Sequence, residues 1–280
     1  MLVASLCFAV MGVCVKLGAS VFSAAELVFY RGLIAALVLL VYIRWRGWPL
    51  KSAHWRAQIN RGVSGFVSQV LYFFAIGALP LATAVTLTYT SPLFFAMFLA
   101  VWSGQRLRPS VIGALALGFI GVVVLLQPTL RHDQLLPALV GLGSGLLAGV
   151  AYFNVRRLGE LGEPEWRIVF YFSVIATLAG TPWVLFSHPF HQFDGRGIAL
   201  LLGVGVFGVA AQLAMSRAYR FGKTFVSASL AYSTVIFSTL FGALLWSEVP
   251  SPVSWLGIAA IIASGVMASM RPRAAPIEQD

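Results

Sequence analysis

The sequence predicts an all-α polytopic membrane protein, with ten transmembrane helices arranged as two inverted five-helix repeats around a central cavity. Three observations lead to this prediction. Of the 280 residues, 59% are hydrophobic and only 10% are charged, a composition that excludes a water-soluble globular domain. Apolar stretches of about 20 residues, the length that crosses a bilayer, recur along the chain. The two halves of the chain also match each other in sequence.

Ten apolar stretches, separated by short polar or Gly- and Pro-marked turns, are candidates for membrane spans. The first is the shortest, because Met1 to Val15 reaches only about 22 Å at 1.5 Å per residue. Either Lys16 snorkels to the membrane surface, or an upstream start is missing. The predicted spans cover residues 1–19, 24–43, 60–79, 82–103, 110–127, 137–156, 167–186, 197–218, 224–246 and 253–270.

The basic residues predict the direction of these spans. The formal net charge is +10, and most Lys and Arg residues fall in every second loop, which the positive-inside rule places in the cytoplasm. We therefore expect both termini in the cytoplasm and the protein in an inner membrane of bacterial type. The opposite side holds only Lys16, Arg131 and Arg196, and Arg31 lies within a span. The expected cytoplasmic residues are Arg44, Arg46, Lys51, Arg56, Arg61, Arg106, Arg108, Arg156, Arg157, Arg167, Arg217, Arg220, Lys223, Arg271 and Arg273.

An internal repeat appears when the chain is aligned with itself at an offset of 143. Residues 62–109 then match 205–252 without a gap, and eleven of the 48 pairs are identical. The sequence thus predicts a first repeat over 1–127, a second over 137–270, and a cytoplasmic tail over 271–280. Because five spans per repeat is an odd number, the second repeat is expected to enter the membrane upside down, as in many secondary transporters.

Several motifs resemble those of a known family. They are FYRGLIAAL around Arg31, GALPLATAVTLTYTSPLF before GQRLRPS, and its echo AYRFGKTFVSASLAYSTVIF before WSEVPS. Over nearly the whole chain the sequence resembles EamA-type members of the drug/metabolite transporter superfamily, and within it bacterial exporters of aromatic and other amino acids. It departs from the family pattern at Gln105, where a Glu is common and the second half has Glu248. It also has Val235 where the first half has Pro92.

Polar residues deep in lipid are costly, so they are expected to face the bundle interior or an aqueous cavity. The repeat matches four such residues of the first half with four of the second. On an ideal helix Thr86, Tyr89 and Thr90 share one face, and so do their counterparts. Two such faces would line a chamber of hydroxyls and rings that suits a zwitterionic amino acid. The alternative is that these residues hold helices together by hydrogen bonds. The pairs are Gln69 with Gln212, Thr86 with Ser229, Tyr89 with Tyr232, and Thr90 with Ser233, and Tyr72, Tyr152 and Asn154 could extend the lining.

Two further residues are candidates for special roles. Arg31 lies about 10 Å inside its predicted helix, where a charge is a candidate functional residue. It either attracts a carboxylate of the substrate or holds helices together against backbone carbonyls. Pro92 removes a backbone hydrogen bond, so we expect a bend there that acts as a hinge.

Other patterns weigh against alternative functions. Only Glu26 and Glu248 lie near predicted spans, both at the ends, which argues against an exporter of cationic drugs and against proton coupling through a buried acid. Gly141, Gly143 and Gly145 resemble a nucleotide-binding loop, but Gly141, Gly145 and Gly149 recur every four residues, as in helix packing. The histidines show no metal-ligand spacing, and no hydrolase motif occurs.

The sequence therefore predicts a non-enzymatic secondary transporter that exports amino acids by alternating access. Its expected partners are the substrate and the lipid bilayer, without a cofactor, metal or nucleic acid, and one chain is expected to suffice. Two alternatives stay open. The chain could carry another class of metabolite, such as a sugar phosphate, a nucleotide-sugar or a cationic drug, or it could be a membrane receptor or assembly subunit that transports nothing.

Overall fold

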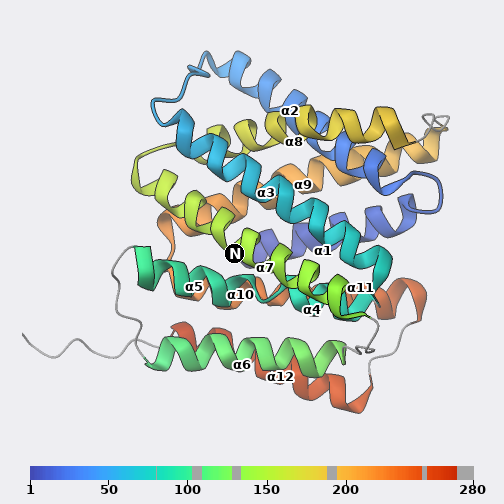
Figure 1. Cartoon of the computed structure of the whole chain (residues 1–280), viewed down its shortest axis with the longest axis vertical. Helices are drawn as coiled ribbons and strands as arrows, with labels where there is room; N and C mark the ends of the chain where they lie inside the picture. Colours follow the sequence, from blue (N-terminus) through green and yellow to red (C-terminus); the bar gives the residue numbers. More distant parts are fainter. Residues whose placement is uncertain (80, 103–108, 128–133, 188–193, 248–250, 270–280) are drawn as a thin grey trace, which may run out of the picture.

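The computed structural model describes the chain except for residues 80, 103–108, 128–133, 188–193, 248–250 and 270–280 (Figure 1). All regular elements of the described residues are helices. They are α1 (Leu2–Gly18), α2 (Ala24–Arg46), α3 (Trp55–Ala78), α4 (Leu81–Thr88), α5 (Ser91–Trp102), α6 (Pro109–Leu126), α7 (Leu135–Glu160), α8 (Glu165–Ser187), α9 (Gly195–Phe221), α10 (Thr224–Ala231), α11 (Ser233–Trp246) and α12 (Pro252–Ser269). Gln105, Glu248 and the predicted tail fall outside the described residues, as do Arg106, Arg108 and Arg131.

The helices are those of a polytopic membrane protein. Seven described segments are long and apolar enough to cross a bilayer, and α1 and α12 add two shorter apolar helices. Helix α3 is not among the seven, which we attribute to polar residues along its first half, such as Gln58 and Arg61. The count of ten spans therefore stays a prediction.

Local sequence explains several helix ends. Helix α2 begins with a capping box, in which the Ser23 hydroxyl accepts from the Glu26 amide and the Glu26 carboxylate accepts from the Ser23 amide at 2.8 Å. Helices α6 and α12 begin at Pro109 and Pro252, a matched pair of the repeat. Proline is well suited to a first helical position. Its fixed φ matches that of a helix, and an N–H at this position would have no acceptor within the helix, so its absence costs nothing.

Two of the predicted spans, 82–103 and 224–246, each contain a short interruption of the helix, although each remains one apolar segment long enough to cross a bilayer. Helix α4 ends at Thr88 and α5 begins at Ser91, while Tyr232 alone separates α10 from α11. Tyr89 and Tyr232, which the repeat pairs, thus both lie at interruptions. Pro92 is the second residue of α5 and follows the first interruption. The second interruption has no proline, and Tyr232 keeps the right-handed helical conformation, with φ −61° and ψ −21°.

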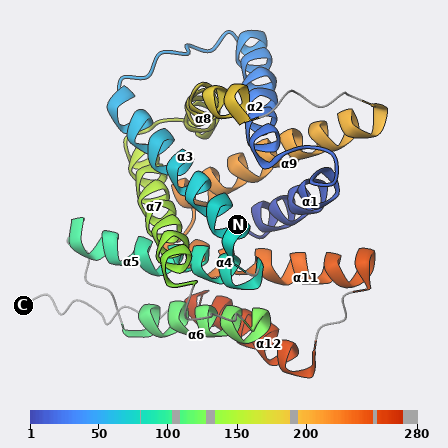
Figure 2. The same cartoon turned by 45° about the vertical axis from the view of Figure 1, so that its right-hand side comes forward.

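The helices pair in a pattern that is preserved when the halves are exchanged. Helix α1 packs on α9 as α7 packs on α3, and α2 packs on α9 as α8 packs on α3. Helices α1 and α11 correspond in the same way to α7 and α5. Two further pairs join equivalent helices, α2 with α8 and α6 with α12, and these lie at opposite ends of the view (Figures 1 and 2).

Glycines allow the closest of these approaches. A Cβ at Gly145 would lie 2.6 Å from the Leu87 carbonyl oxygen, and one at Gly149 would lie 3.0 Å from the Phe95 amide nitrogen. The prediction that the glycines of this stretch serve helix packing is confirmed. They seat α7 directly against the first interruption.

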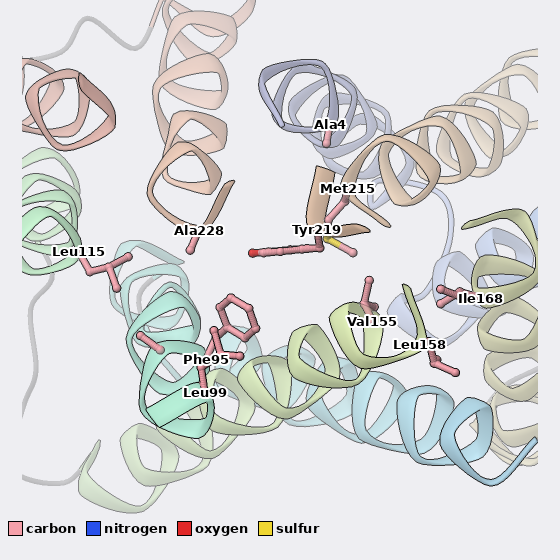
Figure 3. Packing of buried hydrophobic residues seen from close by; sticks show 11 residues of the cluster. Ala4, Phe95, Leu99, Leu115, Val155, Leu158, Ile168, Met215, Tyr219 and Ala228 are labelled. Carbon is pink, nitrogen blue, oxygen red and sulfur yellow. The ribbon is translucent and has the colours of Figure 1, made fainter. Parts of the chain in front are cut away.

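A cluster of eleven buried hydrophobic residues joins α1 to the helices from α5 through α10 (Figure 3). Leu158 and Ile168 belong to it and flank the turn between α7 and α8. This end of the bundle carries the loop 47–54 and the turns 161–164 and 222–223, and we call it the basic end. The cluster therefore packs the bundle interior toward the basic end.

A carboxylate ties the loops of the basic end together. Glu163, only 3% exposed, accepts hydrogen bonds from the Ser52 hydroxyl at 2.5 Å and from the Arg167 guanidinium at 2.9 Å, and the His54 Nδ1 lies 3.1 Å away. Arg167 also donates to the Pro49 carbonyl at 3.0 Å. Burial alone would raise the pKa of Glu163, but these hydrogen bonds outweigh it and hold the pKa below its ordinary value.

We expect Glu163→Gln to lower the free energy of unfolding by about 1–3 kcal/mol, because it leaves the Arg167 guanidinium without its charged acceptor. A carboxylate with a depressed pKa stabilises above its unfolded pKa of about 4.3, and this stability is lost as the pH falls. The difference in thermal unfolding between wild type and variant should thus be largest near neutral pH and shrink below about pH 4.

The matched control is Glu160→Gln. Glu160 pairs with Arg156 at 2.7 Å but is 58% exposed, so its loss should cost well under 1 kcal/mol. Equal effects of the two substitutions would contradict the role given to Glu163.

Candidate functional site

Two arginines lie within helices of the bundle, Arg31 half-buried on α2 and Arg61 buried on α3. Arg31 is seven residues after the start of α2, as predicted. Arg61 was expected in a loop, but α3 begins at Trp55 and therefore holds Arg61 within the helix, where it is only 2% exposed. Arg61 was counted with the loop residues although it is the second residue of the predicted span 60–79. The helix begins five residues before that span, so the loop assignment is wrong. A stripe of polar or small residues could have revealed the helix, since Gln58, Arg61, Gly65, Gln69 and Tyr72 recur every three or four residues.

Neutral groups surround the Arg61 guanidinium. Its Nη2 donates to the Gln212 amide oxygen at 3.1 Å, and its central carbon lies 4.3 Å from the centre of the Phe172 ring. Its Nε is buried and has no hydrogen-bond partner among the described residues. Gly65 leaves room for this arrangement, because a Cβ there would touch the guanidinium and the Phe172 ring.

A pocket between α2, α3, α8 and α9 brings together Arg31 and the matched glutamines Gln69 and Gln212. The space open to a water-sized molecule is about 10 Å³, which is about what one water needs. Phe172 and Gly208 form part of the wall. The wall is mostly apolar, with Arg31, Gln69, Ser173 and Gln212 as its polar groups, and the pocket is contracted in this conformation.

Tyr152 of α7 connects the two arginines to the rest of the interior. It lies in the vicinity of both Arg31 and Arg61, and its hydroxyl lies beside Ser91 at the start of α5. Its ring stacks on Tyr219 with centroids 5.6 Å apart. Figure 3 shows the Tyr219 hydroxyl directed away from α9 into the bundle. Tyr152 therefore links the region of the two arginines to the buried hydrophobic cluster and to the start of α5.

The paired tyrosines meet at the interruptions. The ring centroids of Tyr89 and Tyr232 lie 6.4 Å apart. The two surroundings differ, however. Tyr89 is half-buried next to Thr234, whereas Tyr232 is fully buried against α6 and α12 with its ring close to Gly118. Of this pair, Tyr89 is the more exposed.

The remaining predicted site residues differ in burial and in their hydrogen bonds. Thr88 ends α4, so the hydroxyls of the first half do not share one continuous helical face as expected. The Thr90 hydroxyl donates to the Leu87 carbonyl, and the Asn154 amide donates to the Val150 carbonyl at 3.0 Å. Both side chains thus bond to backbone within four residues of their own position. Thr86 and Ser229 are buried, Tyr72 and Ser233 are half-buried, and the Ser229 hydroxyl lacks a hydrogen-bond partner among the described residues.

No carboxylate of the described chain forms an ion pair with either arginine. The ion pairs found there all belong to the basic end, on Glu160, Glu163 and Glu165. Glu26, on the same helix as Arg31, caps the start of that helix. The site therefore joins two cations to neutral amides, hydroxyls and rings.

Comparisons with known proteins agree on a class. The EamA-like transporter family matches residues 1–127 and 135–270. The chain is 32% identical to the pseudopaline exporter of Pseudomonas aeruginosa over 95% of this chain and 93% of that protein. It is 25% identical to a riboflavin transporter of Rhizobium johnstonii over 88% and 80%. A solved crystal structure aligns with a TM-score of 0.84 over 95% of this chain and 94% of its own, at 20% identity.

The family match covers nearly the whole chain and the fold agrees with it. The resemblance seen in the sequence motifs around Arg31 and before 104–110 is confirmed. This chain belongs to the EamA-like transporter family.

Proposed function

We propose that the chain is a secondary transporter that exports small metabolites carrying amino and carboxylate groups, amino acids above all. The observation that carries this proposal is the polar interior formed by Arg31, Gln69 and Gln212 and continued through Tyr152 to the interrupted helices. Guanidinium and amide groups can hydrogen-bond a carboxylate, and hydroxyls can accept from an ammonium. Rings beside them can receive an apolar side chain.

Alternating access fits the same features. Interrupted helices near the membrane midplane are common at transporter substrate sites, because backbone groups freed by the break can face a cavity. We propose ten spans in two inverted repeats, and the exchange-symmetric helix pairing supports this arrangement. Both termini would lie in the cytoplasm, at the basic end, and one chain would form the whole path.

Counterflow into proteoliposomes tests this function. The purified protein is reconstituted, vesicles are loaded with an unlabelled compound, and uptake of the labelled compound is measured for amino acids, sugar phosphates, nucleotide-sugars and cationic dyes. We expect at least one amino acid to show uptake well above that of protein-free vesicles. Leu244→Ala, at a site 78% exposed on α11, is the control variant and should behave as wild type.

The opposite result is equally clear. Robust counterflow of another class without uptake of any amino acid would refute the proposed substrate, and its failure for all classes would favour a receptor or assembly subunit.

A further inference from the structure

We propose that Arg31 and Arg61 together form an anion site, and that the substrates are acidic, with more carboxylates than ammonium groups. This inference rests on the proposed transport function and specifies its substrate class. It depends on the position of Arg61, on the neutral surroundings of both guanidinium groups, and on the comparison of the two halves.

The first step concerns charge. A buried cation without an opposite charge is unfavourable in a low-dielectric interior, and two near each other are more so. Arg31 and Arg61 interact repulsively with each other. The groups identified around them are the Gln212 amide, the Phe172 ring and the Tyr152 hydroxyl, and all three are neutral. Two positive charges thus remain uncompensated within the described chain, and an anionic ligand would compensate them.

The second step concerns unused donors. The Arg61 Nε is buried and has no hydrogen-bond partner among the described residues, although buried polar groups are nearly always paired. A guanidinium presents its donors in a planar fork that matches the two oxygens of a carboxylate. Gln69 and Gln212, which share the pocket with Arg31, add amide donors. The site is therefore equipped for an oxyanion beyond the hydrogen bond that Arg61 already makes.

The third step shows that packing does not require these arginines. At an offset of 141, Phe29, Tyr30 and Ile34 of α2 match Phe170, Tyr171 and Ile175 of α8. The contacts match as well, because Gly62 meets Ile175 just as Gly205 meets Ile34. In this alignment the counterpart of Arg31 is Phe172, and Gly65 meets Phe172 as Gly208 meets Arg31.

The counterpart of Arg61 at the repeat offset of 143 is likewise apolar, Val204. The second half thus builds the equivalent packing with Phe172 and Val204. The first half places charges at these two positions, which points to a binding role that only one half supplies.

The contracted pocket adds a condition. Because it has room for about one water, an acidic metabolite must bind in a wider conformation of the bundle. Gln212 lines this pocket and is then positioned to exchange its bond with Arg61 for one with the ligand.

Glutamate and glutamine provide the matched test, because they have nearly the same shape and differ by one negative charge. We expect wild-type counterflow to favour glutamate over glutamine by tenfold or more. Arg31→Gln and Arg61→Gln should bring this ratio close to one, while Arg31→Lys and Arg61→Lys keep part of it. Arg46→Gln, an exposed arginine at the end of α2, is the control and should leave the ratio unchanged.

A binding measurement on the wild type covers the case in which a variant fails to fold. Glutamate should raise the thermal unfolding temperature of the detergent-solubilised protein, and glutamine at the same concentration should not. Equal shifts, or equal counterflow, would overturn the anion site even if amino-acid transport itself is found.

Two further compounds separate the anion site from the proposed function. Succinate carries carboxylates without an amino group, and glycerol 3-phosphate carries a phosphate. Transport of either that depends on both arginines, with no transport of any amino acid, would support the anion site and refute amino-acid export. Transport of neutral amino acids at the same rate as acidic ones would support amino-acid export and refute the anion site.

Discussion

Tyr232→Ala is expected to lower the free energy of unfolding by about 3–5 kcal/mol, the range found for removal of a large buried side chain. Tyr232 is fully buried and packs with Val122, Val235 and Ile261 between α6, α11 and α12. The loss leaves a cavity where these three helices meet. Thermal unfolding in detergent, followed by tryptophan fluorescence, measures the effect.

Tyr89→Ala is the matched control, because Tyr89 is the repeat counterpart of Tyr232 and lies in ring contact with it. Tyr89 is only half-buried, so its truncation should cost less than half as much stability. We expect Tyr89→Ala to reduce the rate of counterflow more than it reduces stability. Tyr232→Phe keeps the ring and should stay within about 1.5 kcal/mol of wild type. Equal destabilisation by the two alanine substitutions would contradict this division of roles.

Gly145→Ala is expected to destabilise the protein by about 1–3 kcal/mol, the usual cost of added volume in a well-packed interior. The new methyl group would lie 2.6 Å from the Leu87 carbonyl oxygen and in contact with the Thr90 hydroxyl. A rotamer change moves the hydroxyl away, but the carbonyl belongs to the backbone of α4, so α7 must move. Because this contact lies next to the interruption, the rate of counterflow should fall as well.

The control for this substitution is Gly143→Ala on the same helix. A Cβ at Gly143 would lie 3.6 Å from its nearest neighbour, the end of the Leu71 side chain, which is ordinary contact. Its introduction should be neutral or slightly stabilising, since alanine is the better helix former. If both variants unfold at the same temperature, the close approach of α7 to α4 is not a constraint on the fold.

Much of the fold follows from short-range sequence patterns. Apolar length located the helices, and the spacing of Gly145 and Gly149 predicted a close helix contact that depends only on which residues share a face. The pairing of Tyr89 with Tyr232 in the repeat placed two rings that the structure brings together. Such features are repeated or local, so one sequence is enough to reveal them.

The second interruption was not predicted, and the first only as a bend at Pro92, because a break of one or two residues leaves the apolar character of a span unchanged. Pro92 was the local signal for the first, and the second has no proline. Arg61 was misplaced for a related reason, since hydropathy marks where a helix becomes apolar and not where it begins. The different burial of Tyr89 and Tyr232 depends on neighbouring helices, which a repeat alignment treats as equal.

The two interior arginines also bear on the energy source for export. A cell interior that is electrically negative pushes an anion outward, and each elementary charge that crosses 100 mV releases about 2.3 kcal/mol. The membrane potential would therefore drive the export of a substrate that Arg31 and Arg61 select for its negative charge. Such a carrier needs neither a proton nor a sodium gradient, which fits a sequence whose spans place no acidic residue at mid-depth.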